Sequence, residues 1–113
     1  EGSFYGHLTE LMLNEINFSK VMFGIRAISL ENGLTNDFVA EIPTDRKILK
    51  MAREVILVAD HTKFNRVSTA LVCSISEIHR IITDDQAPRG LIEEFRKQGI
   101  EVIVAPRIEK GAG

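Results

Sequence analysis

The sequence predicts an α/β fold, a layered parallel β-sheet of about four strands with flanking helices. Strand-like apolar runs alternate along the chain with helical patterns, which is typical of parallel sheets with right-handed crossovers. Val55–Ala59 is continuously apolar, as in a strand buried on both faces. The length of 113 residues suits one domain or part of one.

The first half of the chain predicts two helices and a strand. The signals are apolar residues at helical spacing, a short β-suited run and a proline at a first helical position. They are helix Ser3–Ile16, strand Lys20–Ile25, and a helix opened by Pro43 with Ile48, Leu49 and Ala52 on one face. Residues 31–37 between strand and second helix are rich in turn formers, and Gly33 is free to adopt positive φ.

The second half predicts three more strands and one helix. The strands are Val55–Ala59, Arg80–Thr83 and Ile100–Ala105, and the helix begins at Pro88 and is closed by Gly99. Residues 61–76 mix polar loop residues with a short apolar patch and give no clear element. We expect residues 108–113 to form a disordered tail.

Composition excludes several classes of protein. No apolar run approaches the roughly 20 residues of a membrane helix. A net charge of −2 argues against this chain itself being a nucleic-acid-binding surface. The single Cys73 cannot form an internal disulfide and suits a small core position. The three histidines lack zinc-site spacing. A cytoplasmic location is the default expectation, with no membrane partner. A start without Met, directly in a helical pattern, suggests a piece of a longer protein.

Charged residues follow two predicted strands, where open α/β sheets bind ligands. After the first, Lys63 is the better candidate for a ligand contact, and Asp60 for shaping the loop. After the second, Asp84 and Asp85 invite an acid, base or metal role. They also suit the approach to the helix opened by Pro88, which we favour.

Five segments in register resemble the C-terminal effector domain of DeoR-type bacterial transcription repressors. The resemblance runs from about Tyr5 to Val104. No segment is specific alone, and the order and spacing carry the comparison. The segments are Ala52–Asp60, Lys63–Phe64, Ile81–Asp85, Gly33–Thr35 and Gly99–Ile103.

The resemblance implies that residues 1–107 form the distal half of a ribose-5-phosphate isomerase/CoA-transferase-like domain. Such domains bind a phosphorylated sugar or similar anionic metabolite, and binding changes operator affinity. The family's winged helix-turn-helix, which contacts operator DNA, and its Asp-Ser-Gly-Thr-Thr phosphate loop are absent from this chain and would lie upstream. The family usually forms homodimers or homotetramers.

This sequence departs from the family after its first strand. Where the family typically reads Gly-Ala-Asp-Gly-Ile, this chain has Gly24-Ile25-Arg26-Ala27-Ile28. An arginine can hold phosphate or carboxylate through two parallel hydrogen bonds. The predicted effector-binding residues are therefore Arg26, Gly33, Leu34, Thr35, Lys47, Asp60, Lys63 and Asp84.

Two of these predictions leave alternatives open. Gly33-Leu34-Thr35 can present backbone amides and a hydroxyl to a phosphate, or simply connect two elements. Lys47 can face the ligand or the solvent.

Three functions compete. The first and preferred one is an effector sensor of carbohydrate metabolism, with no catalytic residue, metal or cofactor. The second is a sugar-phosphate isomerase, which needs a general base where Arg26 stands. The third is a pure assembly module, and fold alone does not choose among them.

Overall fold

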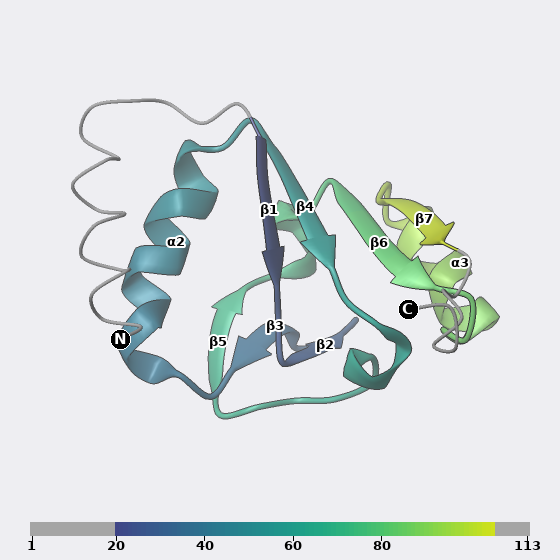
Figure 1. The fold of residues 1–113 in the computed structure, drawn as a ribbon, viewed down its shortest axis with the longest axis horizontal. Helices are drawn as coiled ribbons and strands as arrows, with labels where there is room; N and C mark the ends of the chain where they lie inside the picture. The colour runs from purple at the N-terminus through teal and green to yellow at the C-terminus, as the bar shows by residue number, and fades with distance from the viewer. Residues whose placement is uncertain (1–19, 106–113) are drawn as a thin grey trace, which may run out of the picture.

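The computed structural model describes residues 20–105, which confirm the predicted α/β class (Figure 1). Four parallel strands form one sheet in the order β1-β4-β6-β7. They are β1 Lys20–Gly24, β4 Glu54–Val58, β6 Arg80–Asp84 and β7 Glu101–Ala105. The predicted helix 3–16 and tail 108–113 lie outside the described residues.

The spatial order of these strands matches their order in the chain, so right-handed crossovers place every connection on the same face. Helix α2 (Ile42–Met51) and helix α3 (Arg89–Lys97) both send side chains into the core cluster. Leu49 of α2 and Phe95 of α3 are among these core residues. The described part of the chain thus covers one face of the parallel sheet.

Pro43 and Gly99 mark helix ends as predicted from the sequence, but the prediction for Ala52 is wrong. Pro43 lies in the first turn of α2, and Gly99, at φ +89°, follows the end of α3. Ala52 is not on the α2 face, because it lies just past the helix with extended backbone angles. It still packs against the core from that position.

A second sheet of three antiparallel strands was not predicted. Its order is β2-β3-β5, with β2 Ala27–Ser29, β3 Gly33–Asn36 and β5 Ala70–Cys73. Residues 31–37 are therefore only partly a turn, and the unassigned stretch 61–76 contains a strand. The turn is 30–32, between β2 and β3, where the Asn32 amide donates to Ser29 Oγ at 3.0 Å.

The small sheet is tightly packed and closed at one edge. Ile28 and Leu34 are fully buried. A Cβ on Gly33 would lie 2.5 Å from the Cys73 carbonyl oxygen, so the approach of β5 requires glycine there. The guanidinium of Arg46 donates to the carbonyls of Leu71 and Val72, which occupies acceptors that the β5 edge would otherwise expose. Short 3₁₀ turns, η1 Val39–Glu41, η2 His61–Lys63 and η3 Ile75–Glu77, join the larger elements.

Candidate functional site

The loop after β4 is shaped by Asp60, one of the two roles that the sequence left open. Its carboxylate accepts the amide of Thr62 at 2.8 Å and also the Thr62 hydroxyl. These hydrogen bonds lower the pKa of Asp60. The same turn carries Lys63, whose amide donates to the Asp60 carbonyl at 3.1 Å. Asp60 therefore fixes where the Lys63 side chain leaves the backbone.

Asp84 ties this loop to the end of β6. Its Oδ2 accepts the His61 amide at 2.9 Å and lies 2.9 Å from His61 Nδ1, while Oδ1 accepts the Gln86 amide at 2.8 Å. Burial alone would raise the pKa of Asp84, but the hydrogen bonds from His61 and Gln86 outweigh it and lower the pKa. Asp84 is thus a structural clamp between two strand ends.

Among the residues that the structure describes, Asp60, His61 and Asp84 form the one group of three possible metal ligands. Their ligand atoms lie within 4.8 Å of one another. Both carboxylates already hold the loop through the contacts above. The loop itself accounts for this arrangement, and we assign no metal to it.

A groove brings two of the predicted residues together with one that was missed. Arg26, between β1 and β2, and Lys63 of η2 line a hollow of about 250 Å³ with Arg66. Asp37 and Ser68 complete its polar walls, and Thr35 lies buried beside it, its Oγ1 accepting the Ser68 amide at 2.7 Å. The lining residues are Arg26, Ala27, Asp37, Lys63, Arg66, Val67 and Ser68.

The groove is electropositive. Three basic side chains and one carboxylate line it, giving a formal charge of +2. Arg26 Nε lies 3.4 Å from Asp37 Oδ1, and both side chains are exposed, so water screens this ion pair strongly. A concave basic surface of this kind attracts anions.

The loop that carries Arg66 is held in place by the small sheet. Phe64 makes a β-bridge to Ile28, and the Arg66 amide donates to the Ile28 carbonyl at 3.4 Å. The Ser68 amide is bound by Thr35. These contacts fix the backbone of the loop before any ligand arrives, which reduces the entropy lost on binding.

The other predicted residues do not line the groove, and their effector contacts stay predictions. Asp60 and Asp84 hold the loop after β4, as described above. Gly33 and Leu34 are buried in β3, where they pair with β2 and β5. Lys47 is exposed on α2 and does not line the groove. The sequence offered one signal for Arg66, a basic residue three positions after Lys63, but the loop around it had no readable pattern.

Comparison with known proteins decides the family. The family model described as the DeoR C terminal sensor domain matches residues 1–85 of the sequence. This chain belongs to the DeoR sensor-domain family. The match includes the whole groove and every strand except β7.

Relatives of this DeoR sensor domain are named as transcription regulators. A protein of Escherichia coli O157:H7 that carries the name of an aga operon transcriptional repressor is 35% identical over 90% of this chain. One of E. coli K12, named for regulation of the sgc region, is 32% identical over 87%, and the glycerol-3-phosphate regulon repressor of Haemophilus influenzae is 25% identical over 92%. The aligned part spans only 38–40% of these relatives' length. None of the described helices is long and apolar enough to cross a membrane.

Proposed function

We propose that this DeoR sensor domain binds a phosphorylated sugar or a related anionic metabolite in the groove between Arg26, Lys63 and Arg66. The observation that carries the proposal is the convergence of these three basic side chains on one hollow, from two segments that are far apart in the sequence. A phosphate offers the acceptor oxygens that arginine and lysine bind best. The name of the Haemophilus relative, a glycerol-3-phosphate regulon repressor, supports this class of ligand.

The proposed output is regulation of transcription, with no chemical step. The full-length protein, a homodimer or homotetramer, would bind operator DNA through an N-terminal domain outside this chain, in the cytoplasm. The effector would bind one arrangement of the oligomer more tightly than the other and so shift operator affinity. No cofactor is required for such a shift.

An isomerase on the related fold is the alternative, and the groove favours it less. That reaction needs a general base beside the substrate. Among the described groove residues the only carboxylate is Asp37, which pairs with Arg26. A turnover of sugar phosphates by the intact protein would favour the enzyme.

The test is calorimetric titration of the intact protein with a panel of sugar phosphates. A hydrogen bond to a charged group contributes about 1.5–3 kcal/mol, and each 1.4 kcal/mol changes affinity about tenfold. We expect Lys63→Ala and Arg66→Ala each to weaken the best ligand by about 10- to 100-fold. Lys50→Ala, an exposed lysine of α2 outside the groove, is the control and should leave affinity unchanged. Unchanged affinity in both groove variants would rule out the groove.

A further inference from the structure

One residue of the effector groove does not suit a site that binds phosphate alone. Asp37 is the single carboxylate among the described residues that line the groove, and the other charged side chains there are basic. A carboxylate repels an anion and offers no donor to the oxygens of an ionised phosphate ester. Its presence indicates a ligand that carries hydrogen-bond donors as well as negative charge.

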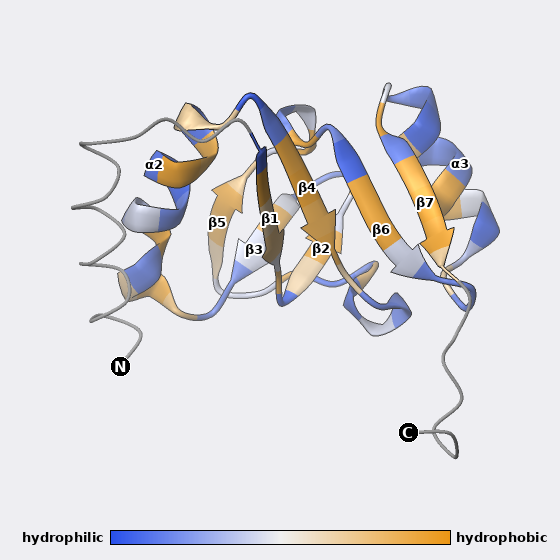
Figure 2. Cartoon of the chain, turned by 45° about the horizontal axis from the view of Figure 1, so that its top comes forward, coloured by the Kyte–Doolittle hydropathy of each residue, from blue (hydrophilic) through white to orange (hydrophobic). Residues whose placement is uncertain are grey.

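The pairing of β2 with β3 brings Asp37 to the groove. Ala27 lies opposite Thr35 in these antiparallel strands. Arg26, which precedes β2, and Asp37, which follows β3, therefore meet at one end of the small sheet. Figure 2 shows the two strands side by side, with hydrophilic colour where β3 ends. The strand register, and not the exposed ion pair alone, thus places Asp37 beside the basic side chains.

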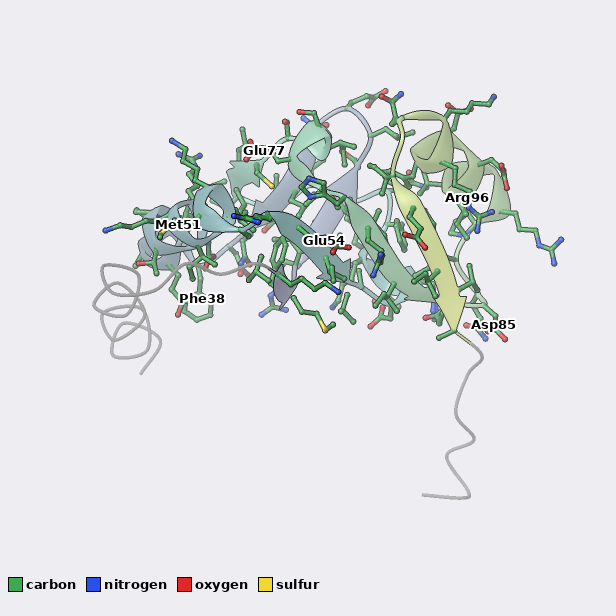
Figure 3. The ribbon with its side chains drawn as sticks, turned by 90° about the horizontal axis from the view of Figure 1, so that it is seen from above. Phe38, Met51, Glu54, Glu77, Asp85 and Arg96 are labelled. Atoms are coloured by element: carbon green, nitrogen blue, oxygen red, sulfur yellow. The ribbon has the colours of Figure 1, made fainter. Side chains whose placement is uncertain are left out.

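A second hollow, of about 310 Å³, has a different balance of charge. Its charged lining residues are Asp85, Arg89, Glu93 and Arg96. Basic and acidic groups match in number there, and Arg96 pairs with Glu93 at 3.0 Å. Figure 3 shows Asp85 and Arg96 at the opposite end of the molecule from Phe38, the neighbour of Asp37. The effector groove instead has three basic groups to one carboxylate, so Asp37 leaves two positive charges unmatched.

This surplus of positive charge suits one phosphate group, and the Asp37 carboxylate stays accessible to the rest of the ligand. A phosphate ester carries a charge of about −1.5 to −2 near neutral pH, which matches the formal +2 of the groove. Within the part of the chain that the structure describes, Arg26 is the one side chain that contacts this carboxylate. The two side chains are 59% and 47% exposed, so water weakens their ion pair and a ligand hydroxyl can reach Asp37.

We propose that Asp37 makes the groove selective for phosphate esters that carry hydroxyl groups. The three basic side chains hold the phosphate, and the Asp37 carboxylate accepts hydrogen bonds from hydroxyls of the sugar. A site built to bind a hydroxyl rejects an analogue without it, because a polar group then loses its partner. Toward a plain phosphate ester Asp37 contributes only repulsion. This inference rests on the proposed function and names the residue that distinguishes a sugar phosphate from other phosphate esters.

Asp37→Ala in the intact protein tests the proposal, because two kinds of ligand should respond in opposite directions. The probes are methyl phosphate and a panel of glycerol 3-phosphate, ribose 5-phosphate and glucose 6-phosphate, at about pH 8, where phosphate esters are almost fully ionised. We expect the variant to bind methyl phosphate about threefold more tightly, because a like charge several Å away in water is lost. We expect it to bind the best sugar phosphate about tenfold more weakly, because a charge-assisted hydrogen bond is lost.

Calorimetric titration supplies the affinities, with methyl phosphate measured by displacement of the best sugar phosphate. Glu31→Ala is the matched control and should change neither affinity, because it removes an exposed carboxylate beyond the other end of β3, outside the groove. Weaker binding of both ligands by Asp37→Ala, tighter binding of both, or an unchanged preference for the sugar phosphate would overturn the proposal and leave the anion groove intact. Binding of neither ligand by the wild type, or binding unaffected by Lys63→Ala and Arg66→Ala, would overturn the proposed function itself.

Discussion

Replacing Gly33 with alanine tests how β5 fixes the start of β3. A Cβ at this position would lie 2.5 Å from the Cys73 carbonyl oxygen, and φ is +76°. The left-handed conformation costs other residues about 1–2 kcal/mol, and an extra methyl in a packed site about 1–3 kcal/mol more. We therefore expect Gly33→Ala to lower the free energy of unfolding by about 2–5 kcal/mol, from the sum of these terms.

Two other glycines separate the backbone cost of positive φ from the cost of the close contact with Cys73. The assay is urea unfolding followed by circular dichroism. Gly99 has φ +89° but no atom within 4 Å of a Cβ, so Gly99→Ala should lose only the backbone cost of about 1–2 kcal/mol. Gly90 lies in α3 with open space around it, so Gly90→Ala should gain about 1 kcal/mol of helix propensity. A loss at Gly33 no larger than the loss at Gly99 would refute the argument from close approach to Cys73.

Two further variants probe the loops around the groove. Thr35→Val removes the acceptor of the Ser68 amide. We expect this variant to lose about 1–3 kcal/mol of stability and to bind the effector several-fold more weakly. Thr69→Val, at an exposed threonine, is the control. Asp84 has a pKa below its unfolded value, so its contribution to stability is complete above about pH 4 and is lost as the pH falls through the folded-state pKa. The urea midpoint should therefore fall less between pH 5 and pH 3 in Asp84→Asn than in the wild type, whereas Asp85→Asn should follow the wild type. Equal slopes in the wild type and both variants would contradict the role of Asp84 as a clamp.

The parallel sheet could be predicted because its signals are local. Val55–Ala59 and Val102–Ala105 are short apolar runs, Pro43 marks the start of one helix, and Gly99 follows the end of another. The small sheet lacked such signals, since its strands are three or four residues long. The sequence predicts a turn at Gly33 because it shows the conformational freedom of a glycine but not the strand that packs against it.

The site was predictable only in part for a similar reason. Arg26 was found through a departure from a family pattern, and Lys63 through its place after a strand. Arg66 was missed because its position depends on the contacts that Phe64, Arg66 and Ser68 make with β2 and β3. The Ser68–Thr35 bond spans 33 residues of sequence. No local pattern encodes a contact of that range.

The most direct test of an anion-binding groove compares two ligands that differ only in the phosphate group. Calorimetric titration of the intact protein should use the best sugar phosphate from the panel and the same sugar without its phosphate. Two charge-assisted contacts of about 1.5 kcal/mol each predict that the phosphorylated form binds at least about 100-fold more tightly. Equal affinity for the two sugars would contradict the account.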